Sequence, residues 1–306
     1  MMDLVTSNNL LINIMTWHLK IKEINTMNIT LNKITIAALT VLSTSFTSNL
    51  FAADISHSLR NTQQDNTTEN YFELGLGLAT GAGPTVEEDK DNEWAGGFLI
   101  VNGSYNWRGF FIEKFGESTD PLVLGYNAYS SDNWSFDIVL APKGRGIQGG
   151  ENDRFHDLDD RDSATMFGGR LTGYIDDNIV QFSVKHNVGS SHNGTTASAL
   201  IGRNWQVRNW NFHGMTGVQF FDAKLNDYYL GISAEEAART DFNEYSPGSN
   251  FNLTAEVGVT YPITEDWVFR STARFAQFLG DKTDSPIFVD KRDNAMSLST
   301  SISYVF

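Results

Sequence analysis

Apolar side chains fall on one parity of the final stretch, from Met296 to Phe306, and serines fall on the other. A period of two predicts a β-strand with one apolar and one polar face. In a soluble protein the apolar face would cover a core, although chain ends are usually loosely held. In a lipid-embedded barrel the apolar face points outward, serines line the interior, and the last strand pairs with the first. This segment alone is compatible with both interpretations.

The same alternation recurs along the chain from residue 72 onward. Clear alternating segments cover 72–78, 99–105, 134–140, 180–185, 210–220, 251–261 and 267–275. Weaker candidates occupy 108–116, 121–130, 164–175 and 194–206. Together with the terminal segment, the pattern predicts about 12 strands, each of them half apolar.

Tight turns and longer loops alternate between these segments. The tight turns lie at 106–108, 131–133, 176–178, 207–209 and 263–266. The long, charged connections lie near 80–94, 142–164, 221–249 and 279–293, and two shorter ones lie near 117–120 and 188–194. This alternation places all tight turns at one end, as in outer-membrane barrels with short periplasmic turns and long outer loops. We therefore predict an all-β fold, a transmembrane antiparallel β-barrel with both termini in the periplasm.

Tryptophans gather beside the predicted tight turns. The residues are Trp107, Trp134, Trp205, Trp210 and Trp267. Aromatic girdles mark the membrane interfaces of barrels, so we interpret these residues as one such girdle. The alternative is that they are ordinary core aromatics that flank turns.

The positions of the six prolines agree with the predicted strands. All six lie in loops or at strand ends, where the missing backbone N–H does not remove a hydrogen bond between strands.

The N-terminal region is predicted to be a leader followed by a polar segment. Residues 27–54 combine a basic residue, a short apolar run and a closing Ala52-Ala53, which is the pattern of a secretory signal peptide cleaved after Ala52. We expect Met27 to be the true start of the protein. The 1–52 region would then consist of a mis-assigned extension, 1–26, followed by the signal peptide. Residues 53–70 are polar and are expected to form a disordered periplasmic lead-in. The barrel would then occupy 71–306.

Composition narrows the class further. The chain of 306 residues contains no cysteine and carries a formal net charge of −15. An exported chain without cysteine is not stabilised by disulfides. The acidic balance argues against nucleic acid as a partner, because proteins that bind nucleic acid need basic stripes on their surface. No segment after the leader is apolar enough to span a membrane as a helix.

Charges of both signs are predicted to face the barrel interior. They are Glu73, Glu113, Asp137 and Glu256 together with Arg170, Lys185, Arg270 and Arg274. Mixed charges suggest salt-bridge ladders that fill the lumen. The alternative is a narrow selective pore, because about 12 strands enclose more room than the eight that side chains alone can fill.

Two loop segments carry candidate local structure. Ser233 and Glu236 form a capping box before Ala237-Ala238, so we predict one short helix in the 221–249 loop. This helix could contact a partner or could fold the loop over the mouth. The acidic run 157–162 lacks the glycine and glutamate spacing of a calcium loop. We interpret it as a solvated segment, open to divalent bridging to lipopolysaccharide, and predict no metal site and no cofactor.

An enzymatic function is disfavoured. His186 and His192 flank Ser190 and Ser191, which weakly resembles outer-membrane lipid hydrolases. His186 shares its parity with the lipid-facing Val184, and no third group is placed to orient a histidine. We therefore expect a protein that is not an enzyme.

Two loop motifs and the chain end resemble the MipA/OmpV family of outer-membrane proteins. Residues 227–237, DYYLGISAEEA, resemble its loop signature, and 284–288, DSPIF, resemble a second signature before the final strand. The ending 303–306, SYVF, is similar too, and the likeness runs from about Tyr71 to Phe306. Leu230 departs from the aromatic residue expected at its position.

The resemblance implies more about location than about activity. It implies a cell outer-membrane barrel that acts as a scaffold between a lytic transglycosylase and a peptidoglycan synthase. Other members are linked to porin-like, adhesive or stress-related roles. The signature residues that would contribute to binding are Tyr228, Tyr229, Gly231, Ser233, Glu236, Asp284, Ser285 and Pro286. Tyr304 and Phe306 would form the assembly signal that barrel-insertion machinery reads, and the outer face would meet membrane lipid and lipopolysaccharide.

Overall fold

The computed structural model describes residues 70–86, 93–116, 118–144, 146–149, 153–189 and 191–306. The predicted leader and nearly all of the lead-in lie outside these residues and stay predictions. The described strands are β1 (Tyr71–Ala82), β2 (Glu93–Trp107), β3 (Phe110–Lys114), β4 (Leu122–Ser130), β5 (Trp134–Lys143), β6 (Ala164–Ile175), β7 (Asn178–Asn187), β8 (Thr195–Val207), β9 (Trp210–Phe221), β10 (Asn250–Pro262), β11 (Trp267–Leu279) and β12 (Asn294–Val305). The described helices are η1 (Asp153–Phe155), α3 (Ala223–Leu230), α4 (Ala234–Ala237) and η2 (Lys282–Asp284).

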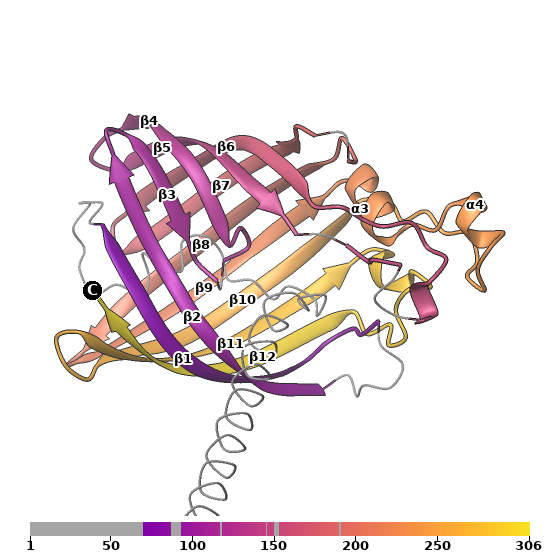
Figure 1. Cartoon of the computed structure of the whole chain (residues 1–306). Coiled ribbons are helices and arrows are strands. Elements are labelled where there is room, and N and C mark those ends of the chain that lie inside the picture. The colour runs from indigo at the N-terminus through magenta and orange to yellow at the C-terminus, as the bar shows by residue number, and fades with distance from the viewer. Residues whose placement is uncertain (1–69, 87–92, 117, 145, 150–152, 190) are drawn as a thin grey trace, which may run out of the picture. The chain divides into compact units, whose positions relative to one another are not determined.

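The strands close into one antiparallel barrel in which each strand pairs with its sequence neighbours. β12 completes the ring by pairing with β1, in a register that places Leu74 opposite Tyr304 and Leu76 opposite Ile302. Figure 1 shows these two strands side by side, with the chain end at the tight-turn end of the barrel. The predicted fold class and strand number are confirmed, and the terminal segment is the closing strand.

The two faces of the strands are inverted relative to a soluble protein. Leu76 and Leu78 on β1 are 70% and 72% exposed, whereas Ser301 and Ser303 on β12 are buried inside the barrel. Exposed apolar side chains continue around the outside on almost every strand. Lipid is the surrounding in which such an outer face is favourable, because it removes apolar surface from water.

The predicted tight turns are all present and lie at one end of the barrel (Figure 1). Arg108, Asp176 and Arg208 there have left-handed φ angles of 50°, 52° and 55°. Positive φ suits the tight hairpin turns that match the right-handed twist of paired strands. At this end Trp107, Trp205, Trp210 and Trp267 are 40–56% exposed, as a girdle requires and as core aromatics would not be. The fifth predicted member, Trp134, is half-buried.

The hydrogen-bonded wall is complete around the tight-turn half and shorter beside β3. The β2–β3 ladder covers only Gly103–Trp107 of β2. Within the described residues, 93–102 of β2 therefore have a ladder partner on the β1 side alone. The tight-turn half thus offers the more rigid frame for inward-facing side chains.

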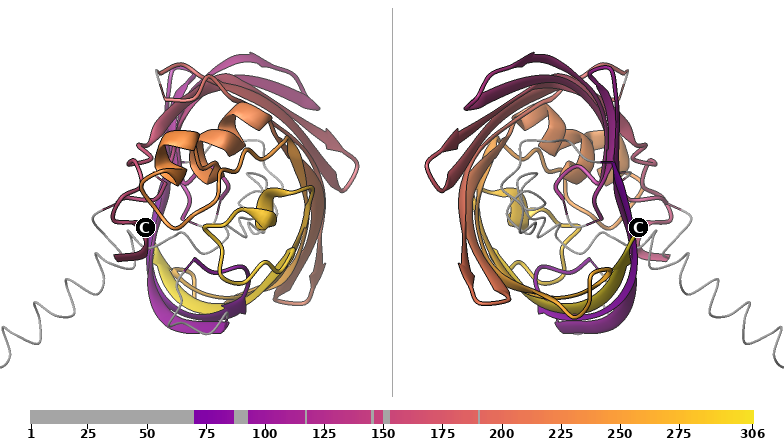
Figure 2. Two further views of the ribbon diagram at one scale, coloured as in Figure 1. Left: turned by 90° about the vertical axis from the view of Figure 1, so that its right-hand side faces the viewer. Right: turned by 90° about the vertical axis from the view of Figure 1, so that its left-hand side faces the viewer.

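The long-loop end carries the helices. Figure 2 shows α3 and η2 projecting within the outline of the barrel opening at this end. α4 has the predicted capping box, in which Ser233 Oγ accepts from the Glu236 N–H at 3.2 Å and Glu236 Oε2 accepts from the Ser233 N–H at 2.9 Å. The prediction of a single helix was wrong, because Asp222 caps α3 by accepting from the Leu225 N–H. None of the described helices combines the length and the hydropathy needed to cross a membrane.

Three outer loops share a small apolar core. Its buried members are Ile147, Phe155, Leu158, Ile232, Ile287 and Phe288. The loops that supply them follow β5, β9 and β11. Their common core explains how connections this long hold a defined arrangement.

Candidate functional site

Eight inward charges were predicted, and the structure places them in four separate groups. The first group spans the closure of the barrel. Arg270 on β11 pairs with Glu73 on β1 and also donates to Ser303 Oγ on β12 at 3.0 Å. Asn102 on β2 donates to the other oxygen of Glu73 at 3.3 Å. This network therefore ties together the four strands around the β1–β12 seam.

The second group centres on Arg170 of β6. Its guanidinium donates to both carboxylate oxygens of Glu113 on β3, at 2.8 and 3.2 Å, and to Asp137 on β5 at 3.1 Å. Asn127 on β4 donates to the second oxygen of Asp137 at 2.8 Å. The network around this arginine thus links the four consecutive strands β3 to β6, and its contact with Glu113 has the bidentate geometry that makes such pairs strong.

The third group centres on Glu256 of β10. Arg274 on β11 donates to one carboxylate oxygen at 2.6 Å, and His213 Nε2 on β9 lies 2.8 Å from the other. His213 is fully buried. With the first two groups, it makes a belt of ion pairs across most of the barrel circumference.

The fourth group lies toward the long-loop end. Lys185 on β7 pairs with Asp120, which comes from the connection between β3 and β4, and both residues are buried. Lys143, the last residue of β5, lies close enough to be attracted by Asp120 and repelled by Lys185. Within the described residues, Lys143 therefore lies beside an ion pair without forming one of its own.

The residues of the predicted loop signatures join the outer loops to one another. Glu236 accepts from Arg161 Nη2 at 2.7 Å and from the Asp159 N–H at 3.1 Å. Burial opposes ionisation of Glu236, yet hydrogen bonds from Ser233, Arg161 and the Asp159 backbone hold its pKa below the ordinary value. The ion pair thus anchors the acidic 157–162 segment, which is only partly the solvated loop that was predicted.

Other signature residues make similar ties. Tyr228 Oη accepts from the Asp162 N–H at 2.8 Å, and Tyr229 Oη lies 3.4 Å from the Asp162 carbonyl. Burial, with Tyr228 and Asp162 nearby, raises the pKa of the Tyr229 hydroxyl. A Cβ at Gly231 would lie 2.4 Å from the Asp227 carbonyl, so only glycine fits there.

The second signature docks on the first. Ser285 Oγ donates to the Leu230 carbonyl at 2.6 Å, and the Pro286 carbonyl accepts from Arg154 at 2.8 Å. The Asp284 carbonyl accepts from Lys291 at 2.9 Å. The two signatures therefore meet in space as one structural unit at the outer mouth.

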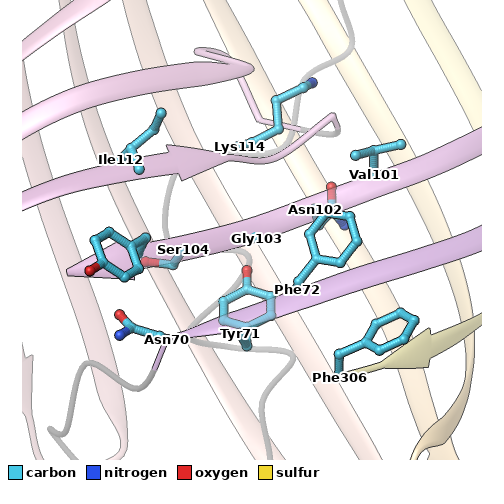
Figure 3. Close-up of a pocket in the computed structure, with 11 residues that line it drawn as sticks. Asn70, Tyr71, Phe72, Val101, Asn102, Gly103, Ser104, Ile112, Lys114 and Phe306 are labelled. Atoms are coloured by element: carbon cyan, nitrogen blue, oxygen red, sulfur yellow. The ribbon is translucent and has the colours of Figure 1, made fainter.

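A pocket of about 480 Å³ opens at the tight-turn rim. Figure 3 shows its walls, which come from the start of β1, the end of β2, β3 and the chain end. Phe306 donates its N–H to the Phe72 carbonyl at 2.8 Å, and its ring lies 5.8 Å from that of Phe72 and 4.7 Å from that of Tyr304. Tyr105 and Ile112 complete the apolar side of the pocket.

Comparison with known proteins decides the family. A family model described as MltA-interacting protein MipA matches residues 76–306, which is the whole barrel except its first residues. The chain belongs to the MltA-interacting protein family.

The chain resembles named relatives in this family by sequence and solved barrels by structure. The MltA-interacting protein of Escherichia coli strain K12 is 28% identical over 228 residues, which cover 73% of this chain and 80% of the relative. YiaT of E. coli O157:H7, whose name assigns it provisionally to the outer membrane, is 27% identical over 205 residues, covering 66% and 80%. In-vitro folded OmpT of Vibrio cholerae superposes with a TM-score of 0.36 at 11% identity, covering 78% of this chain and 97% of that chain. The family match and the closed barrel of this chain together identify an outer-membrane β-barrel.

In this member of the MltA-interacting protein family, the hydrogen bonds of His186 and His192 within the described residues go to groups other than Ser191. His186 Nδ1 lies 2.9 Å from Thr195 Oγ1 on the outer face, and His192 Nδ1 accepts from the Gly194 N–H at 2.9 Å. Ser190 lies outside the described residues. Across the described part of the chain, no group of three or more metal-ligating side chains was found.

Several site residues of this family member were not selected from the sequence. Lys143 has the same inward parity as Asp137, and His213 the same as Asn211, so the alternation could have identified both. Asp120 and Lys282 lie in connections without periodicity, where nothing local indicates which way a side chain points. Arg161, inside an acidic run, carried no signal of its buried pairing with Glu236.

Proposed function

We propose that the protein is a non-enzymatic scaffold that holds a lytic transglycosylase, and with it a peptidoglycan synthase, at the inner surface of the outer membrane. The observation that carries this proposal is the family match across the barrel, to relatives named for interacting with MltA. A barrel with both termini in the periplasm would present its tight-turn rim to such partners.

The interior of the barrel supports a structural role. Three ion-pair networks bind successive strands together between the tight-turn end and the middle of the barrel, and each of their acids has a basic partner. Such networks fix a barrel more readily than they transmit solutes. The signature residues tie loop to loop, so we assign Tyr228, Ser233, Glu236 and Ser285 to holding the outer mouth in shape.

The rim pocket is the contact surface that we propose for the partner. It lies at the tight-turn rim, which would face the periplasm, and its walls are largely aromatic and aliphatic. Aromatic pockets of this kind accept a protruding apolar side chain and commonly contribute much of the binding energy of an interface. Tyr304 and Phe306, beside it, would be read earlier by the insertion machinery while the barrel assembles.

The test is quantitative capture of the transglycosylase from crosslinked envelopes. Tyr105→Ser removes a pocket wall at a 57% exposed position, and Tyr129→Ser is the matched control at a 58% exposed position away from the pocket. We expect the transglycosylase to be enriched with the wild type and the control, and reduced at least several-fold with Tyr105→Ser. No enrichment with the wild type, relative to an unrelated barrel, would exclude the scaffold. Equal capture by all three proteins would exclude only the pocket.

A narrow channel is the second candidate. The observation that favours it is the excess of lysine at the outer end of the lumen. Outer lipopolysaccharide would surround that mouth in either case. Steady ion conductance distinguishes the channel from the scaffold.

A further inference from the structure

Lysines and phenylalanines converge inside the outer end of the barrel. Lys143 Nζ lies 5.1 Å from the ring centroid of Phe221, the last residue of β9. Lys282 Nζ, from η2, lies 5.8 Å from the same ring and 4.6 Å from that of Phe278 on β11. Two ammonium groups from different elements therefore share one aromatic side chain.

These positions face the lumen and not the lipid. Lys143 has the parity of the buried Asp137, and Phe221 has that of the buried Gln219. Phe278 is itself buried. A ligand for this cluster would therefore enter through the outer mouth as a solute.

The charges of the cluster do not balance. Lys185 is paired with Asp120. Among the described residues, no carboxylate makes an ion pair with Lys143 or Lys282, and the remaining compensation comes from the faces of the two phenylalanines. Two of the three ammonium groups, those of Lys143 and Lys282, thus lack an ion-pair partner in a region partly withdrawn from water, although Asp222 follows Phe221 and Asp281 precedes Lys282 in the chain. Unpaired charge in such a region is costly unless a counter-ion completes it.

We propose that Lys143, Lys282 and the Lys185–Asp120 pair bind a phosphate group carried by a small soluble anion. A dianionic phosphate can compensate both ammonium groups that lack an ion-pair partner, whereas a single carboxylate would leave one of these lysines uncompensated. Lysine ammonium groups are compact point charges and bind phosphate without a fixed geometry. Phe221 and Phe278 would hold the two ammonium groups in place for the anion.

The experiment is equilibrium binding of inorganic phosphate to the purified full chain in uncharged detergent at low ionic strength. We expect one saturable site, with chloride at the same ionic strength failing to compete. Lys143→Gln and Lys282→Gln should each weaken binding about tenfold, and the double variant should abolish it. Lys224→Gln on α3, an exposed lysine outside the cluster, is the control with the same charge change and should bind as the wild type does.

Two further arms make the result decisive. Heat-modifiable mobility reports that each variant is folded, and in phosphate-free buffer the Lys143→Gln barrel should be at least as stable as the wild type. Lysine-dependent binding of lipopolysaccharide micelles without binding of free phosphate would overturn the proposal that the ligand is a small soluble anion. Absence of saturable phosphate binding, or its survival in the double variant, would overturn the site.

Discussion

The two halves of the barrel interior treat charge differently. From the tight-turn end to the middle of the strands, Glu73, Glu113, Asp137 and Glu256 all have arginine partners that reach them across strands. At the outer end, Lys185 is paired with Asp120 and Lys143 is also attracted by Asp120, whereas Lys282 has no ion-pair partner among the described residues. Paired buried charges stabilise one arrangement of strands, whereas unpaired charge costs stability and is available to a ligand. The comparison separates a part of the lumen that maintains the fold from a part that is suited to binding.

The largest expected effect comes from breaking a paired group. Arg170→Met leaves Glu113 and Asp137 buried without their guanidinium, and we expect a loss of roughly 3–5 kcal/mol in the free energy of unfolding. Arg203→Met is the matched control, because Arg203 and Asp177 form a pair of which both members are more than half exposed. That control should cost less than about 1 kcal/mol. Urea unfolding in lipid vesicles measures both, and equal losses would show that burial does not distinguish the pairs.

The contribution of Lys282, at the outer end, to the free energy of unfolding should change with pH in the direction opposite to that of a lysine in an ordinary ion pair. Burial, and then repulsion from Lys143, lowers the pKa of Lys282 from 10.5 to about 8. Besides Lys143, the rings of Phe221 and Phe278 face Lys282, and Asp281 and Asp284 flank it on its own segment. Between pH 8 and 10.5 the unfolded chain binds a proton that the folded chain does not. The free energy of unfolding should therefore rise with pH across that window.

The Lys282→Gln variant isolates this contribution. The wild type should gain about 1–3 kcal/mol relative to the variant between the two ends of the window. Urea titrations at pH 7 and pH 10 on both proteins provide the measurement. A stability difference between them that does not change with pH would mean that Lys282 keeps its ordinary pKa and that the outer end is not short of negative charge.

The alternation of side chains made the barrel predictable, and it extends to much of the lumen. Glu73 and Arg270 were predicted to face inward because side chains alternate between the two faces of a strand. This alternation does not predict which inward residues meet, because Arg270 and Glu73 are brought together only when the barrel closes. The apolar loop core was not predictable for a related reason. Ile232, Ile287 and Phe288 come from separate connections, and no local pattern shows that they pack together.

A smaller effect should be confined to the outer loops. Ser233→Ala removes the capping-box hydroxyl of α4 and should cost about 1 kcal/mol of local stability. Hydrogen exchange of the α4 amides should become faster, while exchange on β10 and β11 stays unchanged. Ser249→Ala, an exposed serine of the same loop, is the control. Faster exchange across the whole barrel would show that the loops and the strands unfold as one unit.

The smallest effect on folded stability is expected at the chain end. Phe306 is 68% exposed and makes ring contacts with Phe72 and Tyr304, so deleting it should change detergent refolding only slightly. If it is the assembly signal that we propose, its loss should lower outer-membrane levels and leave unfolded chain in the periplasm. Wild-type levels in the membrane, or equally poor refolding in detergent, would contradict this role.

The most direct test of the account is single-channel recording of the purified, heat-modifiable barrel in planar lipid bilayers, with a known porin as the positive control. A scaffold whose tight-turn half is closed by ion pairs should show no steady conductance steps. Phosphate on the outer side should bind without producing any. Reproducible steady steps from the wild-type protein would contradict the account and establish the lumen as an open channel.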